Sequence, residues 1–233
     1  MLESTVKVYK RETLRKPILI VGVPGIGLVA NVAAKHILMS LNTRKLGEIS
    51  SPFFQDVANV TIDGGIESPI MEMYYWKSDS LNDLIILYGN TQALTTYGQY
   101  ELGGKILDIV QDLDCELVVG IGGLTKETAT GKLNVYCTAT DFGTLDRLLK
   151  HGLKQIQGQV FGMSGLLVGL AKLRGMKGFC LLAETTGAHP DVAVAKAVLD
   201  KLNSILGLKI ELGDVGKSVD EVSNTFALQK DRA

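Results

Sequence analysis

The twenty residues PILIVGVPGIGLVANVAAKH, from Pro17 to His36, constrain the fold more than any other stretch of the chain. Ile18 to Val23 form a continuous apolar run rich in β-branched residues, which is typical of a strand buried on both faces. Pro24-Gly25 predicts a turn, and residues 26–41 have the length and the apolar stripe of a helix. A buried strand, a tight turn and a helix together predict an α/β fold with a parallel sheet.

The same stretch also has features of a secretory signal, because several basic residues precede its apolar run. Proline and glycine interrupt the run soon after it begins, whereas a membrane helix needs about 20 mostly apolar residues. The three cysteines lie far apart and form no CxxC pair, which is typical of reduced thiols. We therefore expect a cytoplasmic protein that does not enter a membrane.

Strands alternate with helices along the rest of the chain, which predicts a doubly wound, mostly parallel sheet with helices on both faces. We predict one α/β domain over residues 1–212 and a helical extension with a frayed tail over 213–233. Ser218 to Glu221 match a capping box for the helix of that extension. The predicted strands are 18–23, 45–50, 57–62, 70–76, 84–88, 117–121, 134–138 and 179–183, and the predicted helices are 26–41, 100–113, 145–150, 166–173, 192–206 and 219–228.

The charge balance argues against two classes of partner. The chain has 24 basic and 25 acidic residues and a formal net charge of -1. Proteins that bind nucleic acid or anionic lipid usually carry a basic excess, so we expect neither partner.

Gly25-x-Gly27-x-x-Ala30 matches the dinucleotide-binding pattern, since it follows a predicted strand and opens a predicted helix. Glu48 lies about twenty residues further on, where that pattern places a ribose ligand. However, Pro24 removes one backbone amide from the turn, and Glu48 falls inside a predicted strand instead of at its end. The pattern therefore favours a close-packed turn over a cofactor site.

Gly162-Met163-Ser164-Gly165 resembles half of a nucleophile elbow, but Leu166 stands where the elbow requires glycine. Serine in front of a helix is more often an N-cap, and we predict that role for Ser164.

The segment from Glu184 to Asp191 is the densest polar cluster of the chain, and it includes His189. These side chains could bind a metal or transfer protons, although their spacing matches no metal signature. The alternative, which the residue types favour, is a strand-to-helix loop in which Asp191 caps the helix.

Loops at the carboxyl ends of parallel strands converge at one edge of a sheet, where ligands tend to bind. We predict a crevice there, with no catalytic set, no metal and no cofactor. Its predicted lining is Gly25, Gly27, Asn90, Gln92, Gly122, Gly123, Gly162, Met163, Glu184, Gly187 and His189.

Five segments, taken in order, resemble the proteasome assembly chaperone family, specifically the archaeal and bacterial relatives of the second eukaryotic chaperone. The resemblance covers about residues 15–212. The segments are VGVPGIGLVANVAAKHIL, YELGGKILDIV, VVGIGGL, VFGMSGLLVGLA and LLAETTGAHPDVAVAKAVLDKL.

The resemblance implies a doubly wound sheet of the phosphorylase/hydrolase type. It also implies a non-enzymatic role in which homo-oligomers bind subunits of the proteasome core particle. An alternative is a nucleotide- or small-molecule-binding enzyme, because the sheet type is shared with nucleoside-processing enzymes and the family has been likened to ATP-grasp ligases.

One departure from the family concerns docking. Members that dock on the proteasome can carry a C-terminal hydrophobic-Tyr-any tail, whereas this sequence ends Asp231-Arg232-Ala233 and has no tyrosine after Tyr136. We therefore expect another surface to make the contact. Val222 and Phe226, on the predicted helix of the extension, are candidates for a contact between subunits or with a partner.

Overall fold

The computed structural model of the chain describes residues 3–9, 12–60, 64–80, 82–126 and 133–226. Nine strands form one sheet, and a separate two-stranded hairpin stands beside it. The strands of the sheet are β1 (Thr5–Val8), β2 (Ile18–Gly22), β3 (Arg44–Ser50), β6 (Met71–Trp76), β7 (Leu84–Gly89), β8 (Leu117–Thr125), β9 (Val135–Ala139), β10 (Lys154–Gln155) and β11 (Lys177–Thr185). The hairpin strands are β4 (Asn59–Val60) and β5 (Ile66–Glu67).

The strands of the sheet lie in the order β1-β3-β6-β7-β2-β8-β11-β9-β10. The four central strands, β7, β2, β8 and β11, are parallel to one another. The pairs β1-β3, β3-β6, β6-β7 and β11-β9 are antiparallel. The doubly wound α/β fold is thus confirmed, with a parallel centre that antiparallel strands extend on both sides.

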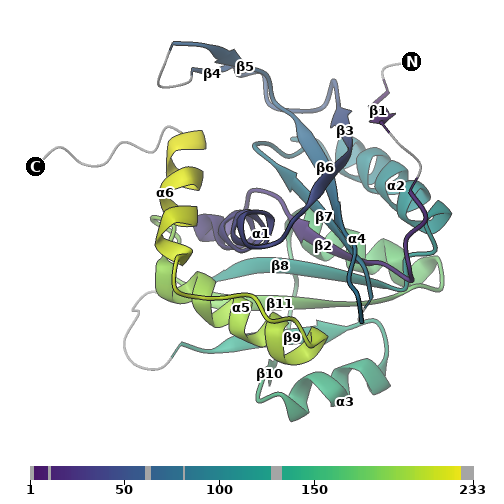
Figure 1. Cartoon of the computed structure of the whole chain (residues 1–233), viewed down its shortest axis with the longest axis vertical. Coiled ribbons are helices and arrows are strands. Elements are labelled where there is room, and N and C mark those ends of the chain that lie inside the picture. Colours follow the sequence, from purple (N-terminus) through teal and green to yellow (C-terminus); the bar gives the residue numbers. More distant parts are fainter. Residues whose placement is uncertain (1–2, 10–11, 61–63, 81, 127–132, 227–233) are drawn as a thin grey trace, which may run out of the picture.

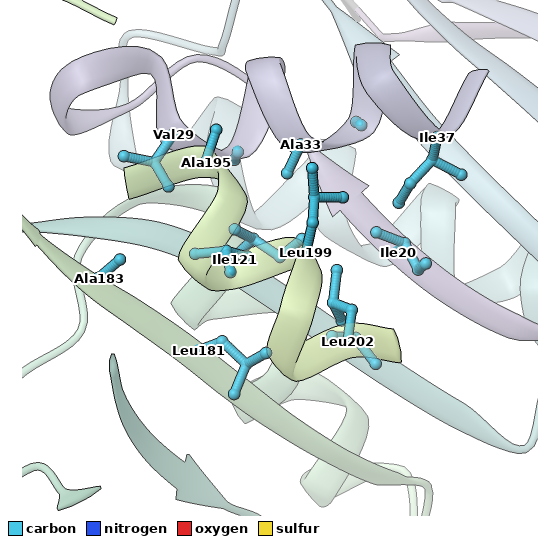
Figure 2. Packing of buried hydrophobic residues seen from close by; sticks show 14 of the residues in the cluster. Ile20, Val29, Ala33, Ile37, Ile121, Leu181, Ala183, Ala195, Leu199 and Leu202 are labelled. Atoms are coloured by element: carbon cyan, nitrogen blue, oxygen red, sulfur yellow. The ribbon is translucent and has the colours of Figure 1, made fainter. Parts of the chain in front are cut away.

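Helices cover both faces of the sheet (Figure 1). Their bounds are η1 (Ile26–Leu28, a 3₁₀ turn), α1 (Val29–Ser40), α2 (Thr96–Asp112), α3 (Phe142–Lys150), α4 (Gly162–Leu173), α5 (Val192–Leu206) and α6 (Val215–Thr225). Alternate residues of β2 point to opposite faces. Ile20 packs with α1 and α5 (Figure 2), and Leu19 belongs to the core on the side of α2 and α4.

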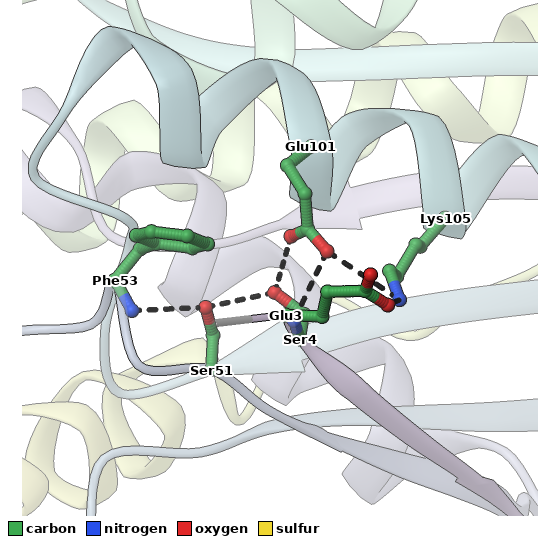
Figure 3. Close-up of polar contacts among 6 residues, drawn as sticks. All are labelled: Glu3, Ser4, Ser51, Phe53, Glu101 and Lys105. Carbon is green, nitrogen blue, oxygen red and sulfur yellow. Dashed lines mark hydrogen bonds and ion pairs between the residues drawn. The ribbon is translucent and has the colours of Figure 1, made fainter. Parts of the chain in front are cut away.

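A cluster of hydrogen bonds and ion pairs connects the N-terminal segment to α2 (Figure 3). Ser4 is buried, and both its backbone N–H and its hydroxyl donate to the carboxylate of Glu101. Ser4 Oγ also lies 2.8 Å from the hydroxyl of Ser51. Lys105 forms an ion pair with the same glutamate at 3.4 Å. This cluster holds β1 at the edge of the sheet, next to β3.

Several helix boundaries differ from the predicted ones. α2 begins at Thr96 because Thr95 caps it by accepting from Gly98 N, and α3 begins after the capping residue Asp141. The predicted N-cap role of Ser164 is wrong, since this residue is buried inside the first turn of α4. The predicted capping box at Ser218 is also wrong, because α6 already begins at Val215.

The C-terminal helix α6 packs with one face against α1 and α5. Val222 is fully buried in the core on the α1 side, and Phe226 is half-buried against the same core. His36 on α1 strengthens this contact, because its Nδ1 lies 2.9 Å from Ser218 Oγ and its Nε2 lies 2.7 Å from the carbonyl oxygen of Glu211. The burial of Val222 and Phe226 leaves little of this apolar face for the contact between subunits that their spacing suggested.

The described residues contain no helix long and apolar enough to cross a membrane.

Candidate functional site at the carboxyl edge of the sheet

The carboxyl ends of β2, β7, β8 and β11 lie at one edge of the sheet, because these strands are parallel and adjacent. We call it the carboxyl edge. The residues predicted to line a crevice lie on the last residues of these strands, on the loops that follow them, or at the start of α4. The contacts of these residues show whether each side chain is free to bind a ligand or is used to hold the fold together.

The turn between β2 and α1 is packed tightly onto the neighbouring strands. Gly27 has φ of +62°, and a Cβ there would lie 2.8 Å from Thr185 Oγ1 on β11. A Cβ on Gly123 of β8 would lie 2.3 Å from the carbonyl oxygen of Ile26. Real Cβ atoms essentially never lie within 3.0 Å of an atom of a distant residue, and the positive φ of Gly27 also disfavours any side chain, so both positions require glycine. These glycines therefore serve close packing, which supports the close-packed turn over the dinucleotide site.

Gln92, on the loop after β7, joins three segments at the carboxyl edge. Its Nε2 donates to the carbonyl oxygen of Pro24 in the β2–α1 turn. Its Oε1 accepts from the backbone N–H of Met163 at 3.1 Å, at the first turn of α4. The same oxygen lies 3.4 Å from Gln99 Nε2, which also donates to the carbonyl oxygen of Ala93. One amide side chain thus fixes the relative positions of three loops.

Replacing Gln92 by leucine is expected to lower the free energy of unfolding by about 2 kcal/mol, because a backbone donor and a backbone acceptor lose their partner. The measurement is urea denaturation followed by circular dichroism. Asn82→Leu is the control, since Asn82 also makes two side-chain hydrogen bonds but these are exposed to solvent, whereas those of Gln92 are partly buried. Equal, small losses for the two variants would contradict the bridging role of Gln92.

Glu184, near the end of β11, is a buried carboxylate whose oxygens accept from four donors. Lys126 Nζ lies 3.1 Å from Oε2, Asn134 donates to Oε2 from both its side chain and its backbone N–H, and the Tyr136 hydroxyl lies 3.0 Å from Oε1. Burial favours the neutral acid, but these hydrogen bonds prevail and lower the pKa of Glu184 to about 2. Three of these donors bond to Oε2 and one bonds to Oε1, so both oxygens are held by neighbouring groups of the fold.

The donors that bond to Glu184 all lie outside the Glu184–Asp191 segment. Asp191 caps α5, with Oδ1 accepting from Ala193 N at 2.7 Å and from Val194 N at 3.2 Å. His189 is exposed on the loop. The described residues contain no group of three or more His, Cys, Asp or Glu arranged to hold a metal. The hydrogen bonds from Ala193 N and Val194 N confirm the predicted capping role of Asp191.

Three further groups have structural surroundings: Asn90 lies at the carboxyl edge, Cys115 precedes β8 at the opposite edge, and Cys180 lies within β11. Asn90 accepts from Ile70 N at 2.8 Å and so holds the segment before β6. Burial raises the pKa of Cys115 to about 11 and that of Cys180 to about 12, which keeps both thiols protonated at neutral pH. Neither cysteine is suited to act as a nucleophile.

Large apolar side chains are exposed on the loops and helix starts of the carboxyl edge. We call this set the apolar rim, and composition patterns did not reveal it because exposure depends on the tertiary fold. Its members and their exposed fractions are Ile26 at 46%, Leu94 at 63%, Tyr97 at 60%, Tyr100 at 54% and Phe161 at 80%. Tyr97 also packs edge-to-face on Phe53, with ring centroids 5.5 Å apart.

Solved structures share the fold over nearly the whole chain. The chain is similar to PbaB of Pyrococcus furiosus, described as an archaeal proteasome activator, with 35% identity, a TM-score of 0.87 and coverage of 98% of this chain and 99% of PbaB. It is also similar to PbaA of the same organism, described as an archaeal homologue of proteasome-assembly chaperone. That match has 24% identity, a TM-score of 0.78 and coverage of 94% and 92%.

Sequence relatives cover the same extent. A protein of Methanocaldococcus jannaschii, described as uncharacterized, is 32% identical over 215 residues, which are 91% of this chain and 83% of the relative. The family model described as the PAC2 family matches residues 19–229, from β2 to beyond α6. This chain belongs to the PAC2 family.

Proposed function

We propose that this chain is a cytoplasmic, non-enzymatic protein that binds subunits of the proteasome core particle as a homo-oligomer and assists their assembly. The observation that carries the contact with the proteasome is the similarity to PbaB, described as a proteasome activator, which extends over nearly all of both chains at 35% identity. PbaA, described as a homologue of an assembly chaperone, shares the fold over most of its length.

The contacts at the carboxyl edge support a non-enzymatic role. Glu184 is engaged by four donors, Asp191 caps a helix, and Gln92 bridges backbone groups. An enzyme would need at least one such group positioned toward a substrate. The crevice residues of this edge are therefore proposed to act as scaffold.

A second candidate function follows from the description of PbaB as an activator. In that case the chain would act on the assembled core particle and raise its peptide hydrolysis. The two candidates differ in their target: the first acts on unassembled subunits, and the second acts on the assembled core particle.

The experiment mixes purified archaeal α and β subunits with and without this chain and follows core-particle formation by native gel electrophoresis. Peptide hydrolysis by preassembled particles is measured in parallel, with serum albumin as the protein control. Faster assembly supports the chaperone role, and faster hydrolysis without faster assembly supports the activator role. No effect in either assay would contradict the proposal.

A further inference from the structure

We propose that Met39, near the end of α1, is a site of oxidation by hydrogen peroxide, and that its sulfoxide loosens the contact between α1 and α6. Met39 is 48% exposed, and its sulfur lies 3.5 Å from the hydroxyl of Ser218 on α6. This modification needs no partner protein, because the contacts that it changes lie within one chain.

Among the methionines that the structure describes, Met39 is the one that an oxidant in solution reaches most easily. Met71, Met73 and Met163 are at most 1% exposed, and Met176 is half-buried. A groove of about 600 Å³ has Met39 in its wall, which is ample for a molecule as small as hydrogen peroxide. Peroxide transfers one oxygen atom to the thioether, so the sulfur is oxidised and the peroxide is reduced to water.

The hydroxyl of Ser218 has one hydrogen atom and two acceptors beside it. His36 Nε2 lies 2.7 Å from the carbonyl oxygen of Glu211, and a carbonyl can only accept, so Nε2 carries the proton of the neutral ring. His36 Nδ1 is therefore an acceptor, and Ser218 Oγ donates to it at 2.9 Å. The thioether sulfur of Met39 is the weaker acceptor, so the hydrogen stays with the imidazole in the reduced protein.

Oxidation of Met39 reverses this preference. A sulfoxide is polar, and its oxygen accepts hydrogen bonds better than a thioether sulfur does. Once that oxygen takes the hydrogen of Ser218, His36 Nδ1 has lost its donor in a side chain that is only 2% exposed. An unpaired buried acceptor costs more than a hydrogen bond near the surface contributes, so the contact between α1 and α6 weakens.

The Ser218 contact lies in the middle of the buried face of α6. Val215, Ser218 and Val222 are spaced three and four residues apart and are all fully buried, so they share the face that packs on α1 and α5. Lys35 and Glu221 also join α1 to α6, as an ion pair at 3.5 Å, but Glu221 is 56% exposed and such pairs stabilise little. Loss of the Ser218 bond should therefore let α6 open more often.

The experiment treats the purified full chain with hydrogen peroxide, locates the added oxygen by peptide mass spectrometry, and measures hydrogen exchange in the peptides that contain α6. We expect Met39 to be oxidised before the buried methionines, and the amides of α6 to exchange about tenfold faster afterwards. Methionine sulfoxide reductases specific for the two sulfoxide epimers should together restore slow exchange. Met39→Gln supplies an amide oxygen at a similar distance and should give fast exchange without peroxide.

Two variants serve as controls. Met39→Leu keeps a similar volume without the sulfur, so its α6 should exchange slowly with and without peroxide. A peroxide effect that acts through a cysteine thiol would persist in this variant. Ser218→Ala removes the shared hydroxyl, so its α6 should exchange equally fast before and after treatment.

Three results would overturn the proposal. The first is oxidation of a buried methionine before Met39, and the second is unchanged exchange of α6 once Met39 is oxidised. The third is an equal response to peroxide in Met39→Leu and in the wild type. Each of these measurements uses the isolated chain, so each is independent of the proposed action on the proteasome.

Discussion

Replacing Gly123 by alanine is expected to lower the free energy of unfolding by about 3 kcal/mol, as a severe case of overpacking. The new Cβ would lie 2.3 Å from the carbonyl oxygen of Ile26 and 2.9 Å from Thr185 Cγ2. The backbone of Ile26 cannot retreat alone, because Leu28 N donates to Gly25 O across the same turn at 3.0 Å. The β2–α1 turn would have to move away from β8.

The same change at Gly169 provides the control. Gly169 lies in α4, and a Cβ there would meet no atom within 4 Å. Gly169→Ala should raise the free energy of unfolding by about 0.5–1 kcal/mol, since alanine is the better helix former. Chemical denaturation measures both variants. Losses below about 0.5 kcal/mol for Gly123→Ala would show that the turn is not packed on β8, and would restore the dinucleotide interpretation of Gly25-x-Gly27.

Glu184→Gln is the second change with a large expected effect, a loss of about 2 kcal/mol at neutral pH. Glutamine keeps the shape but replaces one acceptor oxygen by an NH₂ group. That group would face donors from Lys126, Asn134 or Tyr136, all of which now bond to the carboxylate. Tyr136→Phe removes one of these donors and should cause a smaller loss.

The effect of Glu184→Gln should depend on pH in one direction. The folded-state pKa of Glu184 is about 2, below the ordinary value of 4.5 for a glutamate, so the ionised form stabilises the fold. This stabilisation is complete above about pH 5 and is lost as the pH falls toward 2. The difference in melting temperature between wild type and variant should therefore shrink over that range. A difference that stays constant from pH 7 to pH 3 would show that the charge of Glu184 is not what stabilises the fold.

The sequence predicted the centre of the fold well, for a physical reason. Strands such as β2 and β7 are buried at every residue, so their composition alone marks them. β1 is mostly exposed and has only four residues, and its pairing with β3 makes it a strand. Such a segment carries no hydrophobic pattern that could reveal it.

The candidate site was predictable in position but not in its contacts. The strand pattern placed Gln92 and Glu184 at the carboxyl edge. Their partners lie far away in the sequence, 68 residues for Pro24 with Gln92 and 48 for Tyr136 with Glu184. Pairings of that kind arise only when the strands align, so no local motif could distinguish scaffold from ligand site.

The most direct test of the central claim is sedimentation velocity of the fluorescently labelled chain titrated with purified archaeal proteasome α subunits. The proposal predicts a faster-sedimenting complex whose amount reaches a plateau at micromolar or lower concentration of α subunits. Added unlabelled chain should displace the labelled chain from this complex. A labelled chain that sediments unchanged, with free α subunits and with assembled core particles alike, would contradict it.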